Sequence, residues 1–136
     1  MFLTQDQNQK IITFLQTKMK LRLLIVYGSY ASGHATDESD IDLAFLADDD
    51  IDATKLWFEI SQELASLMHV ESVDLVDMKK IDTVFRFVIV STGKVLFQDG
   101  DYEAYLDLAY TQYLQFTDDC KEILEHYPEM FSKRHP

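Results

Sequence analysis

Two apolar runs joined by a polar loop constrain the fold of this chain more than any other feature. The first run, 21–27, ends at Gly28-Ser29, and the second, 41–47, begins beside two carboxylates, Asp40 and Asp42. Because alternate side chains of a strand share one face, Asp40 and Asp42 project together while their apolar neighbours enter a core. Convergent carboxylates next to a turn with free backbone N–H groups suit the binding of divalent metal ions against a polyphosphate.

The spacing of these residues is more informative than their types. Acidic pairs are common on solvated strands, and Gly-Ser occurs in many turns. Gly28-Ser29 followed after ten residues by Asp40 and Asp42 fixes four positions at once. Chance produces such a match on the order of a few times per thousand chains of this length. The spacing therefore indicates a functional site rather than a solvated face.

A third carboxylate, Asp74, lies inside a third predicted strand, 70–76, where it alternates with apolar residues. An unpaired charge is costly to bury, so an Asp in such a strand needs a partner. If the third strand lies beside the second, we expect Asp74 to join Asp40 and Asp42 in one metal cluster.

The remaining pattern predicts an α+β (mixed α/β) fold in which helices flank a small mixed sheet. Apolar spacing and turn signals predict a short strand at 94–98 and helices at 5–19, 53–68, 81–91 and about 101–127. Gly93 is expected to cap the helix before the short strand. We expect residues 1–136 to form a single domain with its core at about 10–98.

Composition and charge exclude several classes of protein. The formal net charge of −12 argues against a nucleic-acid partner, because phosphate binding needs clusters of Lys and Arg. It favours a basic protein or a cationic small molecule instead. The single cysteine, Cys120, permits no intrachain disulfide, and its apolar helical surroundings predict a buried thiol. The apolar runs are too short to span a membrane and no signal peptide is evident, so we expect a cytoplasmic protein.

The glycine, the serine and the three aspartates together resemble the DNA polymerase β-type nucleotidyltransferase superfamily. Within it, the chain is most similar to the minimal nucleotidyltransferases. Their Gly-Ser-x-Ala-x-Gly pattern is present at residues 28–33, and their usual ending resembles Ile89-x-x-x-Gly93-x-x-Leu96-Phe97. The similarity covers residues 10–98, most of the chain. It departs from the family at Ser32, where an Arg is frequent.

The resemblance implies an antitoxin that transfers AMP from ATP to a tyrosine hydroxyl of a HEPN-type RNase toxin and releases pyrophosphate. It also implies a hetero-oligomer with that toxin. In the arrangement typical of the family, Asp40, Asp42 and Asp74 hold two Mg²⁺ ions, Asp74 also accepts the hydroxyl proton, and Gly28 and Ser29 hold the triphosphate of ATP. Neither nucleic acid nor a membrane is expected as a direct partner.

Two other functions stay open at this point. An antitoxin could neutralise its toxin by stoichiometric occlusion, without catalysis. A nucleotidyltransferase that acts on aminoglycosides would also suit an acidic site, although such enzymes usually carry an additional helical domain.

Three side chains and one helix have open roles. Arg86 and His34 could each contact a phosphate, with exposed positions on a helix and a loop as the simpler alternatives. Tyr30 could shape the mouth of the site or pack. The aromatic residues of the last predicted helix suit either core packing or a protein interface; they are Tyr102, Tyr105, Tyr110, Tyr113 and Phe116.

Overall fold

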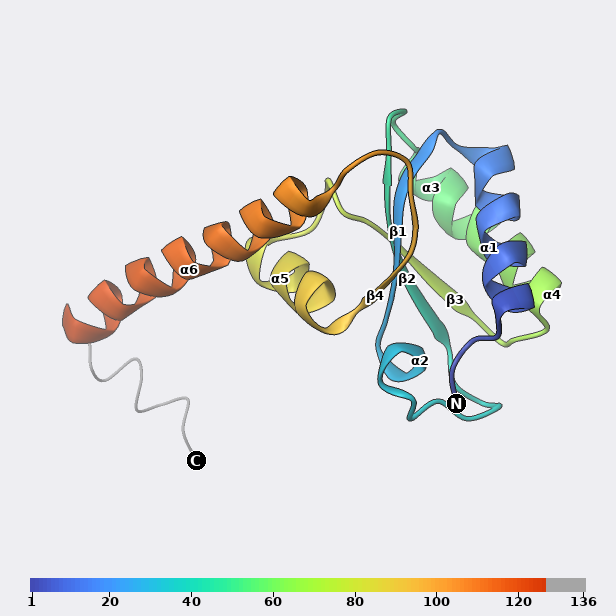
Figure 1. The fold of residues 1–136 in the computed structure, drawn as a ribbon, viewed down its shortest axis with the longest axis horizontal. Coiled ribbons are helices and arrows are strands. Elements are labelled where there is room, and N and C mark those ends of the chain that lie inside the picture. The colour runs from blue at the N-terminus through green and yellow to red at the C-terminus, as the bar shows by residue number, and fades with distance from the viewer. Residues whose placement is uncertain (127–136) are drawn as a thin grey trace.

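The computed structural model of the chain describes the backbone of residues 1–126 and the side chains of residues 1–120. Its strands are β1 (Leu21–Tyr27), β2 (Ile41–Ala47), β3 (Val73–Asp77) and β4 (Lys94–Gln98). They form one sheet in the order β3-β2-β1-β4 (Figure 1). β1 is antiparallel to both β2 and β4, while β2 and β3 are parallel. The sheet is therefore mixed, as the sequence predicts.

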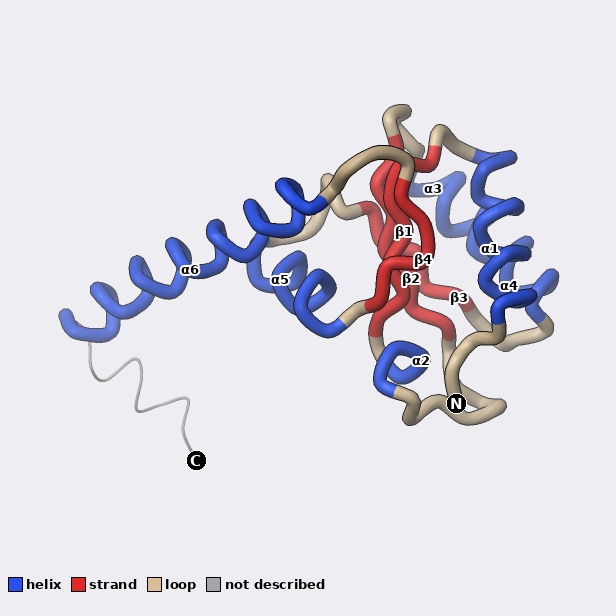
Figure 2. Tube along the Cα trace, in the orientation of Figure 1, coloured by secondary structure: helices blue, strands red, loops and turns tan. Residues whose placement is uncertain are grey.

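Helices cover both faces of this sheet (Figure 2). One face carries α1 (Gln5–Lys18) together with α3 (Ala53–Lys55), the π-helical turn η1 (Leu56–Ile60) and α4 (Ser61–Met68). The other face carries α5 (Thr83–Thr92) and the first turns of α6 (Glu103–His126), whose far end projects away from the sheet. A short helix, α2 (Ser29–Ser32), lies at the end of the sheet where β1 stops.

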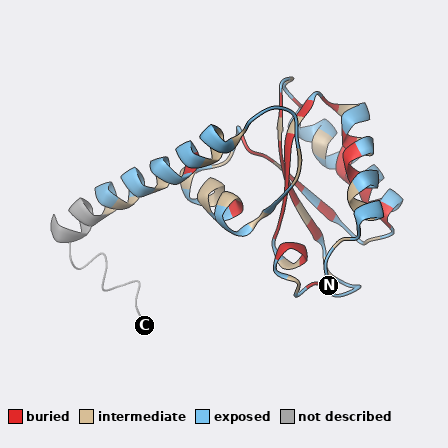
Figure 3. Cartoon of the chain, in the orientation of Figure 1, coloured by how far each residue is buried: buried red, intermediate tan, exposed pale blue. Residues whose placement is uncertain are grey.

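Each face of the sheet has its own apolar cluster, and the two central strands between them, β1 and β2, are mostly buried (Figure 3). On the α1 and α4 face, Leu24, Leu43 and Phe45 pack with Leu15 and are fully buried. On the α5 and α6 face, the second cluster contains Leu23, Ile25, Tyr27, Ala44, Met78 and Ile89. Alternation along β1 and β2 divides their side chains between the two clusters.

Local capping explains where the helices begin. Thr4 and Gln7 form a reciprocal capping box at the start of α1, which satisfies N–H groups that have no partner inside the helix. The carboxylate of Asp82 accepts the N–H of Phe85 at 2.8 Å, so α5 begins at Thr83. The predicted helices are confirmed with shifts of a few residues at their ends, but 53–68 is interrupted by the π turn η1.

Two predicted boundaries are wrong. β3 begins at Val73 rather than at residue 70, because the N–H of Val70 is bonded to the carbonyl of Ala65 at the end of α4. His69, in the left-handed conformation, reverses the chain there. Residues 29–32, predicted as part of a loop, form α2.

Gly93 does end α5, but not through a left-handed conformation, since its φ is −82°. The need for glycine is spatial: a Cβ at this position would lie 2.5 Å from Cγ2 of Ile25 and 2.6 Å from the carbonyl oxygen of Ile89. Cys120 is only partly buried, contrary to the prediction of a buried thiol. The predicted helix end at Tyr127 and Pro128 lies outside the described residues. No described helix has the length and apolar character needed to cross a membrane.

Candidate active site

The carboxylates predicted to form a site lie at one end of the sheet, in neighbouring strands. Asp42 of β2 is paired with Asp74 of β3 on one side and with Tyr27 of β1 on the other. Paired residues of adjacent strands present their side chains on the same face. Tyr27, Asp42 and Asp74 therefore form a row across three strands, and Asp40, two residues before Asp42, precedes the same strand end. The predicted neighbourhood of the second and third strands is confirmed.

This row faces the α5 and α6 side of the sheet. Tyr27 belongs to the apolar cluster beneath those helices, and its ring meets the ring of Phe85 edge to face, with centroids 5.8 Å apart. Asp42 and Asp74 share its face because they share its position in the ladder. The carboxylates thus lie beside α5 and not beside α1.

Gly28 brings the Gly-Ser turn directly against Asp42. Its φ of 69° and ψ of −149° belong to a region that L side chains avoid. A Cβ on Gly28 would lie only 2.3 Å from Oδ2 of Asp42. Ser29 follows as the first residue of α2, where helix N–H groups have no partner inside the helix. The predicted nucleotide-binding pair and the predicted carboxylate pair are therefore in contact.

The carboxylates perturb one another. Burial, then the charges of Asp74 and Asp40, raise the pKa of Asp42 above its ordinary value. Burial also raises the pKa of Tyr27, and the charges of Asp74 and Asp42 raise it further. The Tyr27 hydroxyl is enclosed without a hydrogen-bond partner in the described part of the chain. Tyr27 was missed at the sequence level, because its position before Gly28 gives no sign that it pairs with Asp42.

The donor set fits a hard divalent cation in kind, since carboxylate oxygens are the ligands that Mg²⁺ prefers. Asp40 and Asp74 are exposed and Asp42 is partly buried. Within residues 1–120, no three Asp, Glu, His or Cys side chains converge closely enough to hold one ion. The structure therefore places Asp42 and Asp74 on adjacent strands beside the Gly-Ser turn. The assignment of Asp40, Asp42 and Asp74 as metal ligands stays a prediction.

Asp74 is exposed in the structure, and the buried aspartate of β3 is Asp77. Asp77 is 6% exposed, and its Oδ1 accepts the N–H of Lys79 at 3.0 Å. The ammonium of Lys80 lies 4.0 Å from its Oδ2. Asp77 is at the opposite end of β3 from the row of carboxylates, so it organises the turn after the strand.

The side chains with open roles are now located. Arg86 is partly buried and donates to the carbonyls of Met78 and Ile81, so the exposed position favoured for it is wrong, and its guanidinium tethers the β3–α5 connection. His34 is exposed, with Nδ1 2.9 Å from Oγ of Ser32.

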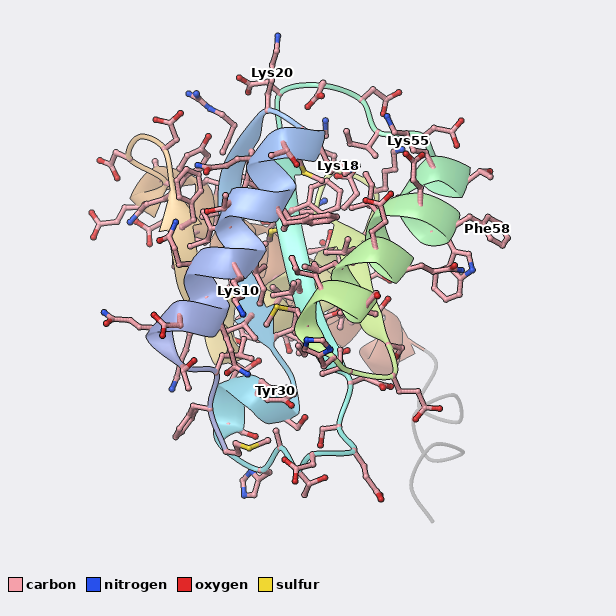
Figure 4. All side chains as sticks on the ribbon, turned by 90° about the vertical axis from the view of Figure 1, so that its right-hand side faces the viewer. Lys10, Lys18, Lys20, Tyr30, Lys55 and Phe58 are labelled. Carbon is pink, nitrogen blue, oxygen red and sulfur yellow. The ribbon has the colours of Figure 1, made fainter. Side chains whose placement is uncertain are left out.

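Two further interactions hold α2 in place, one to the loop that follows it and one to the N-terminal segment. Tyr30 is buried below α1 (Figure 4), and its hydroxyl donates to the carbonyl of Thr36 at 3.5 Å. At the other end of α2, Phe2 covers Gly33, where a Cβ would lie 2.7 Å from the Phe2 ring. The ammonium of Lys94 lies 3.9 Å from the centroid of that ring. The N-terminal segment therefore holds the C-terminal end of α2 in place.

Two of the three carboxylates, Asp40 and Asp74, are exposed, and Asp42 between them is partly buried. One hollow of about 490 Å³ is lined by residues of η1, α4 and the start of β3, and another of about 570 Å³ is lined by residues of α1 and by Leu67. Neither is lined by Asp40, Asp42 or Asp74. The site is therefore accessible to a large acceptor.

Comparison with known proteins agrees with this geometry. Residues 9–102 match the family model described as polymerase beta, nucleotidyltransferase. The chain is 38% identical over 115 residues to the protein adenylyltransferase MntA of Shewanella oneidensis, covering 82% of this chain and 81% of that protein. It is 33% identical over 96 residues to a putative protein adenylyltransferase of Methanocaldococcus jannaschii, covering 65% of this chain and 93% of that protein.

Solved structures give the same result. A toxin–antitoxin complex with AMP-PNP contains a chain that matches with a TM-score of 0.78 and 34% identity, covering 88% of this chain and 96% of that one. A complex of tri-AMPylated Shewanella oneidensis HEPN toxin with MNT antitoxin matches with a TM-score of 0.75 and 32% identity, covering 91% of this chain and 98% of that one. The chain therefore belongs to the polymerase beta nucleotidyltransferase family and is a homologue of the protein adenylyltransferase MntA.

Proposed function

We propose that this protein is an antitoxin that transfers AMP from ATP to a tyrosine hydroxyl of a HEPN-type RNase toxin and thereby neutralises it. The observation that carries the proposal is the contact of Gly28 with Asp42, which is itself in register with Asp74. The relative named as a protein adenylyltransferase and the complex that contains an AMPylated HEPN toxin support the same acceptor.

The reaction is a displacement at the α-phosphorus of ATP. The tyrosine oxygen forms a bond to the α-phosphorus, and the bond from that phosphorus to the oxygen bridging to the β-phosphate breaks. Pyrophosphate leaves with the electron pair of the broken bond. The proton of the tyrosine hydroxyl passes to Asp74, whose exposed carboxylate can meet an acceptor that arrives from solvent.

The Gly-Ser turn holds the triphosphate in this proposal. Without a Cβ, Gly28 lets the backbone approach phosphate oxygens closely. The hydroxyl and the N–H of Ser29, at the start of α2, donate to the β- and γ-phosphates. Because α2 is held at its other end by Phe2 over Gly33, these donors are positioned before ATP binds.

Asp40 and Asp42 would hold two Mg²⁺ ions, and Asp74 would complete the second site. The charge of Asp42 is disfavoured by burial and by its two carboxylate neighbours, which is the electrostatic setting that a cation relieves. When bound, Mg²⁺ neutralises the triphosphate and lowers the pKa of the attacking hydroxyl. The chain's own contribution is to keep these carboxylates on adjacent strand positions beside the Gly-Ser turn.

The exposure of two of the carboxylates supports a protein acceptor. A site for a small molecule is usually a concave cavity that encloses most of its ligand. The hollows of about 490 and 570 Å³ in the described part of the chain are lined by other residues, and Asp40 and Asp74 are exposed, so a second protein is well suited to cover the bound nucleotide. This observation favours an acceptor on a protein over an aminoglycoside.

Position-specific labelling of ATP tests the proposal. We would incubate the protein with its HEPN-type partner, Mg²⁺ and ATP labelled at either the α- or the γ-phosphate. The proposal predicts label on the partner from the α-phosphate and none from the γ-phosphate, with loss of labelling in Asp42→Asn. Transfer from the γ-phosphate, or labelling that survives in Asp42→Asn, would refute it.

A further inference from the structure

The far half of α6 carries apolar side chains that no described part of the chain covers. Near its start, α6 packs against α5: Ala109 is 2% exposed, and the rings of Phe87 and Tyr113 are stacked with centroids 3.8 Å apart. Beyond these contacts the helix continues away from the sheet (Figure 1). There Leu114 and Phe116 are 48% and 44% exposed.

We call the distal α6 surface the set Tyr110, Leu114 and Phe116. Tyr110 is 50% exposed, and one side of its ring meets Phe87 of α5 with centroids 5.3 Å apart. Tyr110 and Leu114 are four residues apart, so they are neighbours on the helix. Phe116 is seven residues after Ala109, so it continues the line of side chains that α5 and the sheet bury. The same line is thus buried at Ala109 and exposed at Phe116, and Figure 3 shows the exposed character of the helix beyond α5.

The charge around this surface selects the kind of partner. Residues 103–120 contain four acidic side chains and no Lys, Arg or His; the acids are Glu103, Asp107, Asp118 and Asp119. Lys10, Lys18, Lys20 and Lys55 lie on the α1 and α3 side (Figure 4), and Lys121 is the first basic residue along α6. An apolar surface whose charged neighbours from residue 103 to residue 120 of its own helix are all acidic is complementary to an apolar surface rimmed by Lys and Arg.

A second copy of the chain is a poor occupant for the same reason. In a two-fold contact the same patch serves on both subunits. Two α6 helices packed antiparallel about the middle of this surface would bring Asp107 of one copy beside Asp118 and Asp119 of the other. Like charges at such short range repel, so a self-contact through this helix would be weakened by its own acids.

The N-terminal end of α6 packs against the same face of the sheet as the carboxylates. Tyr102, Tyr105 and Leu106 pack against the apolar cluster that contains Tyr27. Tyr27 is in register with Asp42, and so the carboxylates share the sheet face on which α6 lies. A protein bound along the far half of α6 is therefore held on the side of the molecule where the displacement would occur.

We propose that the distal α6 surface is the docking site for the protein acceptor, which binds it through an apolar face rimmed by Lys and Arg. This inference rests on the proposed function, because it names where the toxin is held before transfer. α6 supplies binding, and the Gly-Ser turn and carboxylates supply the chemistry. Loss of the docking site should therefore weaken complex formation without altering the site for ATP.

The test compares glutamate substitutions on two faces of α6. Leu114→Glu and Phe116→Glu place a charge in the distal surface, and Gln115→Glu places the same charge between them in sequence but on the opposite side of the helix. We would measure the affinity of each full-length variant for the HEPN-type toxin by titration calorimetry. Leu114→Glu and Phe116→Glu should each bind at least about tenfold more weakly, Gln115→Glu should bind as the wild type does, and wild-type affinity should fall as salt rises.

Thermal unfolding and two milder variants show whether weaker binding results from misfolding. Because the substituted side chains are exposed, the melting temperatures should remain near that of the wild type, and Leu114→Ala and Phe116→Ala should weaken binding in the same order. Unchanged affinity in Leu114→Glu and Phe116→Glu would overturn the inference. A wild-type homodimer that these substitutions disperse would overturn it as well, in favour of a second copy.

Two outcomes separate this inference from the proposed function. If the toxin receives AMP but the distal variants bind it normally, the docking site is wrong and the transfer stands. If the wild type binds the toxin through α6 but transfers no AMP, the docking site stands and the transfer is wrong. A wild type that neither binds nor modifies the toxin would refute both.

Discussion

The contact between Gly28 and Asp42 makes Gly28→Ala a sharp test of the site. The substitution has two separate costs. Alanine avoids the backbone conformation of Gly28, with φ 69° and ψ −149°, by about 1–3 kcal/mol. For a chain of this size, that free energy lowers the melting temperature by roughly 3–12 °C.

The second cost falls on the geometry of the carboxylate. The new Cβ would lie 2.3 Å from Oδ2 of Asp42, whereas ordinary contact begins at 3.4 Å. The carboxylate or the turn must therefore shift by about 1 Å, and a displacement of that size at a reacting centre costs about a hundredfold in rate. We expect Gly28→Ala to fold, to melt earlier and to transfer AMP about a hundredfold more slowly.

Gly100→Ala is the matched control. Gly100 also has a positive φ, +110°, but the nearest atom to its added Cβ is Cε2 of Tyr102 at 3.9 Å. It should therefore lose stability through its backbone alone and keep the wild-type rate of transfer. The assay is the initial rate of partner labelling at saturating ATP, beside a thermal unfolding curve. A wild-type rate in Gly28→Ala, or an equal loss of rate in Gly100→Ala, would refute the reasoning.

Three further predictions concern side chains around the site. Tyr27→Phe should leave the melting temperature unchanged or raise it, because removing a buried hydroxyl without a partner in the described part of the chain relieves about 1–3 kcal/mol of desolvation cost. A clear loss of stability in thermal unfolding would contradict this reading of the hydroxyl. Asp42→Asn should be more stable than the wild type at neutral pH, because the raised pKa of Asp42 means that its ionised form is disfavoured in the folded state. Unfolding curves should show this advantage closing as pH falls through the raised folded pKa and then below the ordinary value of 3.8, where Asp42 is protonated in both states; an Asn variant less stable at pH 7 would contradict the sign. Phe2→Ala uncovers Gly33, so it should raise KM for ATP severalfold with a small change in kcat and in melting temperature, and unchanged kinetics would show that Phe2 does not position α2.

Much of the fold was predictable because its strands are short apolar runs with clear alternation. The bounds of β1 and β2 follow directly from the runs that end at Tyr27 and begin at Ile41. The start of β3 was not predictable, because the N–H of Val70 serves the end of α4 instead of the ladder, and a sequence pattern does not show which bond a backbone group makes. The π turn within 53–68 has the same origin, since its apolar spacing is that of a helix.

The same distinction between local pattern and long-range contact applies to the site. The closeness of the Gly28-Ser29 turn to Asp42 was predictable because the spacing of these residues is fixed along one segment of the chain. Tyr27 and the exposure of Asp74 depend on the register between strands, which pairs residues far apart in sequence. The partial burial of Arg86 was not predicted, because its partners are the backbone carbonyls of Met78 and Ile81. The order of side chains in a sequence does not show where backbone carbonyls lie.

The intact mass of the toxin after reaction shows whether this protein transfers AMP to it. The HEPN-type partner, in large excess over this protein, would be incubated with Mg²⁺ and ATP and then weighed by mass spectrometry, with Asp40→Ala as the control. We expect the excess toxin to gain a whole number of AMP groups, and we expect Asp40→Ala to leave the mass of the toxin unchanged. A toxin that is neutralised only at equal amounts, with no gain in mass, would contradict adenylyl transfer and would establish occlusion instead.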